Sequence, residues 1–362
     1  MARTIRQALR GRSDFVSDIY IKGMLYGTTV RSPFARARID SIDSSALPEG
    51  ITIVTAADIP GQNDLRIGSE RMPILAEKLC EYAGEPVALL AGNSQREVVE
   101  AARQLVVMYE ELDASFEFED WDGQVIRSVT GRRGDPDGAL AQSNQVVEGR
   151  YRTGIQEHMY NEPQGAVAEM DSDGVSVHCA SQWPYHVRDT VANALGTRGA
   201  GCHVTVTDTG VDLDGKLWYP SLVAAHAALL SAKSGSPVKL VYSNLEDFKF
   251  TCKRSPVVVT HLTGVDDTGV ITAAKVDIRY NCGAYPLFTS EMLDRLAATA
   301  LGIYDCANVS VSVSVVRTNL PPLNVLSGFG TASTHFAAET HLSRIVEILQ
   351  ADPVQWRLDR LE

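Results

Sequence analysis

The stretch from Leu25 to about Ala114 constrains the fold most, because strand-like and helix-like patterns alternate along it. Three runs have the β-branched or aromatic character of strands, and a fourth is short and wholly apolar, as in a buried strand. The expected strands are residues 24–30, 51–55, 86–91 and 105–109. Between the last two, Ser94 and Glu97 have the spacing of a capping box, and apolar residues follow at helical spacing. A strand, a capped helix and a further strand predict a compact α/β unit.

The composition changes at residues 121–145, which are polar and rich in turn residues. We expect this segment to be a linker. Beyond it we expect a hairpin at Asp173–Gly174 and a helix that begins at Pro184. Further expected features are a stop at Gly196, a helix capped by Ser221 and ended by Gly235, a hairpin at 267–269, and a last helix that starts near Thr334 and stops before Pro353.

The overall composition excludes several classes of function. The chain has 362 residues and a formal net charge of −12, which disfavours nucleic acid as a partner because phosphate binding needs clustered Lys and Arg. No apolar run reaches the length of a membrane span, and the basic N-terminus lacks the apolar core of a secretory signal. The six cysteines stand far apart, without a Cys-x-x-Cys pair, so iron–sulfur or structural zinc ligation is not expected. Free thiols in a reducing cytoplasm are the simplest interpretation.

Residues 210–216, Gly-Val-Asp-Leu-Asp-Gly-Lys, form the most informative loop. Its glycines and lysine suggest a site where the backbone approaches an anionic ligand. Asp212 and Asp214 oppose that, because a carboxylate about 4 Å from a phosphate oxygen costs about 4 kcal/mol at an effective dielectric near 20. The spacing nearly matches a phosphate loop, but Leu217 stands where a magnesium-binding Ser or Thr is needed. An ordinary surface turn remains the alternative.

Three further segments carry candidate groups. Residues 156–163 place two carboxylates and a histidine close together, which fits a metal site less well than a hydrogen-bonded structural network. Gly328-Phe329-Gly330 would let the backbone approach a ligand beside a stacking ring, or would form a tight turn with a core phenylalanine. Arg295 lies in a stretch that can be helical, where an arginine is usually solvated or in a surface ion pair.

The order of these motifs resembles the large subunit of the molybdenum hydroxylases, the xanthine dehydrogenase and aldehyde oxidase family. The matching segments are Thr28–Ile39, Gly84–Leu89, Gln156–Pro163, Ser181–Pro184, Lys253–Pro256, Gly283–Tyr285, Gly328–Gly330 and Phe336–Glu339. Each motif alone is weak, but together they run from about residue 16 to the C-terminus in a specific order.

The resemblance implies an α+β fold, in which an N-terminal α/β hammerhead domain precedes the first half of a molybdopterin-binding domain. The expected ranges are 1–120 for the hammerhead-like domain, 121–145 for the linker and 146–362 for the molybdopterin-binding-like domain. It also implies a molybdenum cofactor (molybdopterin) that carries out the hydroxylation, with iron–sulfur clusters and FAD only on partner subunits. A cytoplasmic hetero-oligomer acting on a small-molecule substrate, with no nucleic acid and no membrane, is the expected setting.

Site residues follow from the same resemblance, position by position. Gln182 falls where the family's glutamine hydrogen-bonds an oxygen on molybdenum, and Arg295 falls where purine-oxidising members orient their substrate; these two are the expected catalytic residues. The expected cofactor-binding residues are Gln182, Gly210, Gly215, Lys216, Gly328, Phe329 and Gly330. No side chain is expected to ligate a metal.

Departures from the family pattern leave two hypotheses open. Val211, Asp212, Leu213 and Asp214 replace a Gly-Gly-Phe-Gly run, and Ser327 replaces an arginine whose loss removes about 2–5 kcal/mol when such a contact is buried. The chain also ends before the segment that supplies the family's catalytic glutamate. We therefore expect a subunit that is not active alone and that needs a second chain, carrying the other half of the site, for the catalytic base. The alternative is a non-catalytic scaffold or assembly subunit that has lost cofactor binding.

Arg295 favours an aromatic N-heterocycle or purine-like substrate, whereas Leu217 replaces the glutamate of purine-oxidising relatives.

Overall fold

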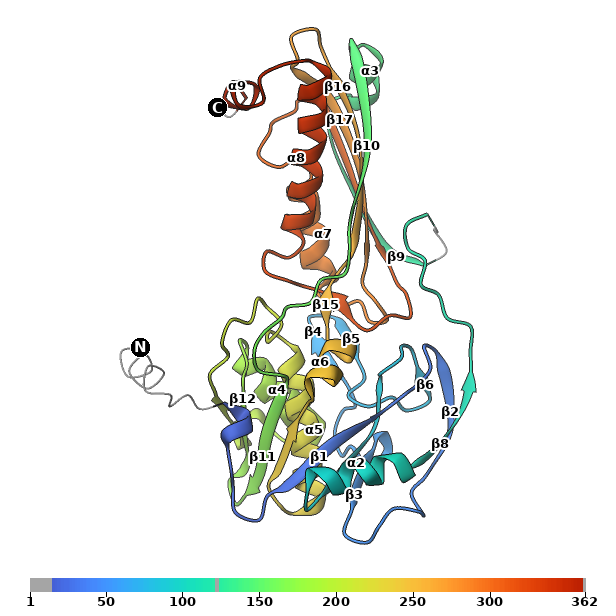
Figure 1. Cartoon of the computed structure of the whole chain (residues 1–362), viewed down its shortest axis with the longest axis vertical. Coiled ribbons are helices and arrows are strands. Elements are labelled where there is room, and N and C mark those ends of the chain that lie inside the picture. The colour runs from blue at the N-terminus through green and yellow to red at the C-terminus, as the bar shows by residue number, and fades with distance from the viewer. Residues whose placement is uncertain (1–14, 121–123, 361–362) are drawn as a thin grey trace, which may run out of the picture. The chain divides into compact units, whose positions relative to one another are not determined.

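The computed structural model describes residues 15–120 and 124–360, which form two compact units of mixed helix and sheet (Figure 1). Unit 1 combines the chain up to Ala114 with His158–Cys252 and Asn319–Pro321. Unit 2 combines Ser115–Glu157, Lys253–Thr318 and Pro322–Glu362. The expected ranges 1–120, 121–145 and 146–362 divide the chain by sequence, whereas the two units interleave it, so those ranges stay a prediction.

Unit 1 is built around a seven-stranded mixed sheet whose neighbouring strands come from distant parts of the chain. Its order is β13 (Cys202–Val206), β12 (Gly174–Cys179), β11 (Gly165–Asp171), β14 (Val238–Val241), β1 (Leu25–Arg31), β7 (Pro86–Gly92) and β3 (Thr52–Thr55). Every residue of β7 is buried, as its unbroken apolar run predicts. Two small sheets complete the unit: β6 (Leu79–Cys80), β2 (Ala37–Asp43) and β8 (Val106–Glu111), and β4 (Leu65–Ile67) with β5 (Glu70–Met72).

The helices of unit 1 begin and end largely where their sequence signals predict. They are η1 (Val16–Asp18), η2 (Ala56–Asp58), α2 (Gln95–Gln104), α4 (Pro184–Leu195), η3 (Gly199–Gly201), α5 (Tyr219–Ser234) and α6 (Asn244–Phe250). Ser94 caps α2 by accepting a hydrogen bond from the Glu97 N–H, and Gly196 and Gly235 end α4 and α5 in the left-handed conformation. Ser221 is not the cap of α5: it lies inside the helix, which starts at Tyr219.

Unit 2 is built on a five-stranded sheet. The order is β10 (Gln145–Thr153), β16 (Val257–Val265), β17 (Ile271–Asn281), β18 (Val309–Val316) and β9 (Val125–Arg133). The helices are α3 (Pro136–Ala141), α7 (Thr289–Ala298), α8 (Thr331–Ile348) and α9 (Pro353–Leu358), and β15 (Lys253–Arg254) pairs with β19 (Leu323–Asn324). α8 packs on β10 and β16, and α7 packs on β18 and β9 (Figure 1). The apolar stripe of α8 contributes Leu342, Ile345 and Val346 to a core cluster with Trp356.

Two boundaries in unit 2 differ from the expectations. The expected linker 121–145 includes β9 and α3, because β9 is an edge strand whose mostly exposed residues give no apolar alternation to read. The helix expected near Thr334 is α8, which starts at Thr331 because Gly330 takes the N-cap position at a φ of 87°. It is not the last helix, because α9 begins at Pro353. The 267–269 hairpin joins β16 to β17, as predicted.

Candidate functional site

The 210–216 loop lies in unit 1 between β13 and the buried helix α5. Gly210, Leu213 and Asp214 have φ values of 66°, 47° and 70°. The left-handed region is easy for glycine but costs about 1–2 kcal/mol for other residues. The loop therefore adopts a backbone suited to glycine at two positions where the sequence has a leucine and an aspartate.

Gly215 is a buried position of the loop that packs closely on two rings of unit 1. A Cβ there would lie 2.4 Å from Tyr160 Cε1 and 2.8 Å from His158 Cγ. The Gly215 N–H donates to Asp212 O at 2.8 Å, and Gln164 Nε2 donates to Gly215 O at 2.8 Å. A larger residue would displace the loop or the tyrosine ring beneath it.

The Lys216 side chain points into unit 1 and is fully buried. Its Nζ donates to Pro163 O at 3.1 Å, lies 3.8 Å from Glu162 Oε2, and sits 4.9 Å from the centre of the Tyr160 ring. Burial lowers the pKa of Lys216, and the Glu162 carboxylate acts in the opposite direction. The ammonium is therefore compensated from within the unit rather than by an external anion.

Glu162 connects Lys216 to the N-terminal part of the described chain. Its Oε1 accepts a hydrogen bond from the Val16 N–H at 2.8 Å, and its side chain is only 8% exposed. Burial raises the pKa of Glu162, whereas Lys216 and the Val16 N–H oppose that rise. The pair thus holds two charges that burial alone would neutralise.

Gln182 is exposed and is attached to the same loop by two hydrogen bonds. Its N–H donates to Lys216 O at 2.9 Å, and its Nε2 donates to Asp214 Oδ1 at 3.1 Å. α4 begins two residues later, where the Trp183 ring stacks on His186 at 4.5 Å. The structure therefore brings Gln182 together with Asp214 and Lys216 at the C-terminal end of the 210–216 loop, although the Lys216 side chain faces inward.

In unit 2, the Gly328-Phe329-Gly330 turn is held against the helix that carries Arg295. All three residues have positive φ, at 96°, 53° and 87°. A Cβ on Gly330 would lie 2.8 Å from Leu296 Cδ2 of α7, and Phe329 packs edge-on against Phe288 at 5.7 Å between ring centres. Arg295 is exposed on α7, which confirms that its stretch is helical.

The polar 156–163 segment forms separate contacts within each unit instead of one cluster. Glu157 pairs with Lys253 at 2.8 Å, whereas Glu162 pairs with Lys216. In the described part of the chain, no group of three or more His, Cys, Asp and Glu side chains could hold a metal ion. The hydrogen-bonded network is the alternative that these contacts favour.

Sequence reasoning missed the buried groups that support the loop from below. Gln164 and Asp247 are 0% and 5% exposed, and both belong to the network under Gly215. Gln164 directly follows the 156–163 segment, but Asp247 is far along the chain in α6. A long-range partner of this kind leaves no spacing signal.

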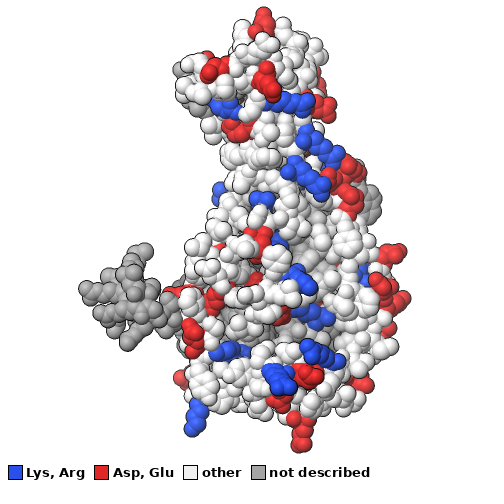
Figure 2. All heavy atoms as spheres, in the orientation of Figure 1, with Lys and Arg blue, Asp and Glu red and all other residues white. Residues whose placement is uncertain are grey.

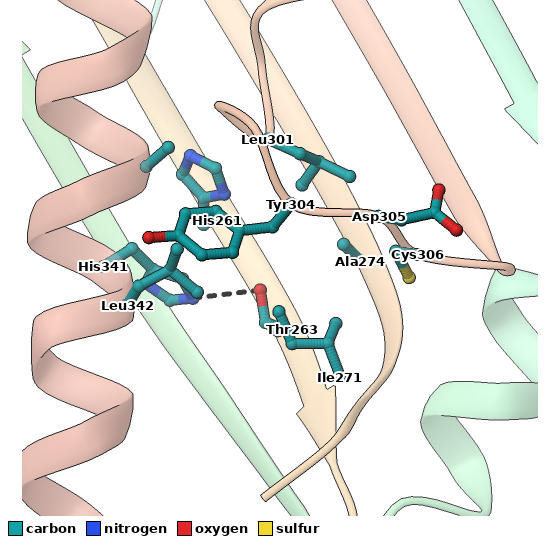
Figure 3. Close-up of a pocket in the computed structure, with 11 residues that line it drawn as sticks. His261, Thr263, Ile271, Ala274, Leu301, Tyr304, Asp305, Cys306, His341 and Leu342 are labelled. Carbon is teal, nitrogen blue, oxygen red and sulfur yellow. Dashed lines mark hydrogen bonds between the residues drawn. The ribbon is translucent and has the colours of Figure 1, made fainter. Parts of the chain in front are cut away.

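A second buried polar group lies in unit 2, around a small pocket between α8 and the sheet (Figure 3). The His261 and His341 rings stack at 4.9 Å between centres, and His341 bonds Tyr151 through Nδ1 and Thr263 through Nε2, at 2.8 and 3.0 Å. His261 Nε2 has no hydrogen-bond partner among the described residues. Burial lowers the pKa of His261 to about 3 and that of His341 to about 4, so both rings are neutral at pH 7. The cavity of about 10 Å³ has room for one water molecule.

Two family models match the chain in succession. The a/b hammerhead domain of aldehyde oxidase and xanthine dehydrogenase matches residues 10–113, and the molybdopterin cofactor-binding domain matches residues 118–361. The chain therefore belongs to the xanthine dehydrogenase and aldehyde oxidase family of molybdopterin-binding oxidoreductases. This confirms the family predicted from motif order and the α+β fold of a hammerhead domain followed by a molybdopterin-binding domain.

Individual relatives differ in how much of their length the chain spans. It is 30% identical to a protein of Bacillus subtilis described as a probable xanthine dehydrogenase subunit, over 97% of this chain and 49% of that one. It is 29% identical to the nicotinate dehydrogenase large molybdopterin subunit of Eubacterium barkeri, over 97% of this chain and 86% of that one. Quinoline 2-oxidoreductase from Pseudomonas putida 86 has the same fold, with a TM-score of 0.86 and 26% identity, over 98% of this chain and 48% of that one. The chain thus spans about half of two of these relatives and most of the third.

On the face drawn in Figure 2, basic and acidic side chains are intermixed. Arg132, for example, pairs with both Asp135 and Asp137 at 3.1 Å. No helix within residues 15–120 and 124–360 has both the length and the apolar character needed to cross a bilayer.

Proposed function

We propose that this chain is a subunit of a molybdenum hydroxylase-type oxidoreductase that contributes part of the molybdopterin and substrate site. The observation that carries the proposal is its match to 86% of a relative named as a large molybdopterin subunit. Its match to only 49% of the Bacillus subtilis relative supports a second chain that carries the other half of the site and its catalytic base.

The residues of unit 1 fit the cofactor in conformation. The loop keeps a glycine-like backbone, and Gly215 is held over the Tyr160 ring in a space that a Cβ would fill. The exposed Gln182 amide uses one of its two N–H groups on Asp214. It therefore has a donor and an acceptor to offer to a polar ligand.

These residues would hold the cofactor in different ways. Gln182 would bind through its amide, the 210–215 backbone would lie against the pterin, and Lys216 would act through the loop because its ammonium is buried. Gly328, Phe329, Gly330 and Arg295 remain predicted cofactor and substrate residues of unit 2. When bound, the molybdenum cofactor supplies the redox centre for hydroxylation of a small molecule. An aromatic N-heterocycle is the substrate class that Arg295 favours.

The second candidate is a non-catalytic scaffold, and two contacts favour it. The Asp214 carboxylate accepts the Gln182 hydrogen bond and adds negative charge where an anionic pterin would lie. Lys216, the loop's only cation, is paired with Glu162 inside the unit. A scaffold of this kind would keep the fold and bind no cofactor.

Purification of the chain with its natural partners separates the two candidates. Metal analysis and pterin fluorescence of the assembled complex should show molybdenum and molybdopterin close to one per chain for the enzyme subunit. A stable complex that lacks both would support the scaffold. The same preparation would reveal whether iron–sulfur and flavin subunits and a chain with the second half are present. A cytoplasmic location belongs to the proposal and is in keeping with six buried cysteines that form no disulfide.

A further inference from the structure

We infer that Gln164 is a positioning residue for residues 210–216, the proposed cofactor loop. With Tyr160 and Asp247 it fixes the Gly215 carbonyl and, through it, the place of the Gln182 amide. The inference deepens the proposed function and rests on it for its meaning, because Gln182 is the group proposed to bind the cofactor. The hydrogen bonds from which it is argued all lie within this chain.

Gln164 is fully buried and uses both hydrogens of its side-chain amide on the site. Nε2 donates to Gly215 O at 2.8 Å and to Tyr160 OH at 3.0 Å. A glutamine amide has two N–H donors, so this atom is fully engaged. Gln164 therefore links the loop backbone directly to the tyrosine ring beneath it.

Asp247 of α6 anchors that link from the other side. Its Oδ1 accepts a hydrogen bond from Tyr160 OH at 2.6 Å, and its Oδ2 accepts one from the Gln164 N–H. Thr251 Oγ1 donates to the same Oδ1 at 3.1 Å. The carboxylate thus holds both the backbone and the side-chain partner of Gln164, so the network has a rigid base in α6.

The network reaches Gln182 through the peptide that follows Gly215. The Gln182 N–H donates to Lys216 O at 2.9 Å, one residue beyond the carbonyl that Gln164 holds. The Gln182 side chain is fixed to the loop a second time, at Asp214 Oδ1. A shift of the Gly215 peptide would therefore move both attachment points of Gln182.

The test compares hydrogen–deuterium exchange in the assembled complex for the wild type, Gln164→Leu and Tyr160→Phe. Gln164→Leu removes both donors at similar volume, and Tyr160→Phe keeps the ring under Gly215 and Lys216 but removes its hydroxyl. We expect exchange of the Gln182 amide to rise about tenfold in Gln164→Leu, as loss of a buried hydrogen bond predicts, and less in Tyr160→Phe. The molybdenum content should fall, or KM should rise without an equal change in kcat, and either effect should be larger in Gln164→Leu than in Tyr160→Phe.

Tyr242→Phe is the matched control. Tyr242 is 3% exposed in the same unit, and its OH makes no hydrogen bond to the described residues of the loop. A merely structural network would lower the melting temperature of Gln164→Leu and Tyr160→Phe without a specific rise in exchange at Gln182, and Tyr242→Phe should leave the exchange of Gln182 unchanged. Unchanged exchange at Gln182 in both Gln164→Leu and Tyr160→Phe would overturn the inference. A wild-type complex without molybdenum would instead refute the proposed function, and the exchange result would still stand.

Discussion

Each unit buries a pair of ionisable side chains, and the two pairs solve the same problem in opposite ways. In unit 1, Lys216 and Glu162 keep both charges and compensate them with each other, with Pro163 O and with the Val16 N–H. In unit 2, His261 and His341 stack as neutral rings whose pKa values fall to about 3 and about 4. The comparison teaches that burial forces a group either to find a counter-charge or to lose its own. The charged pair lies under the 210–216 loop, and the neutral histidine pair lies in the helix–sheet core of unit 2.

Breaking the charged pair should have the largest effect. Lys216→Met leaves Glu162 buried without its counter-charge and should lower the free energy of unfolding of unit 1 by about 3–5 kcal/mol. Calorimetry or denaturant unfolding of the complex measures it. The double variant Lys216→Met with Glu162→Leu should recover much of the loss, because neither charge remains. A single variant as stable as the wild type would show that the two pairs do not differ in this way.

Acid should destabilise the histidine pair of unit 2, which is the next largest effect. Because both histidines have pKa values below the unfolded value of about 6.5, their contribution to stability is present above pH 6.5 and is lost as pH falls toward 4 and 3. Each should cost about 1.4 kcal/mol per pH unit in that window. His261→Phe should reduce this slope for unit 2, measured by unfolding at a series of pH values. His178→Phe, a change at a half-buried position of β12 in unit 1, serves as the control, and an unaltered slope in His261→Phe would contradict the prediction.

A smaller loss of stability is expected where a glycine of unit 2 needs its left-handed backbone. Gly330→Ala places a Cβ 2.8 Å from Leu296 Cδ2 at a φ of 87° and should cost about 2 kcal/mol. Gly131→Ala on β9 is the matched control, because its Cβ would meet open space at an ordinary φ. Thermal unfolding of both variants measures the difference. Equal stabilities would mean that the α7–α8 junction tolerates the extra atom.

The smallest expected effect is a gain at the cofactor loop. Leu213→Gly removes a left-handed leucine and should stabilise unit 1 by about 0.5 kcal/mol, after the extra chain entropy of glycine is subtracted. Val211→Gly, in the same loop but without positive φ, should be destabilising by a similar amount. Paired denaturant midpoints detect the opposite signs. Equal losses in both variants would show that Leu213 is not strained.

The sequence predicted the fold where local chemistry decides it. Ser94, Pro184, Gly196 and Gly235 act at helix ends because capping bonds and left-handed glycine need only near neighbours. Ser221 was wrongly expected to cap α5, since a helix buried on all sides has no apolar stripe to mark its start; Pro220 was the better signal.

The site was less predictable because its supports come from distant segments. Motif order indicated Gln182 and the 210–216 loop, and the structure brings them together. The order of motifs did not indicate that Lys216 would turn inward to Glu162, or that Asp247 would anchor Gln164. Such pairing depends on burial rather than on sequence spacing.

The strand order of unit 1 also governs when the protein can fold. β14 pairs with β11 on one side and with β1 on the other, so it joins the two halves of the seven-stranded sheet. During synthesis, the first strands of the chain must wait for residues 238–241 to leave the ribosome before their sheet is continuous. Until then β1 has an open edge, and chaperones or early partner binding would protect the nascent chain from pairing with another molecule there.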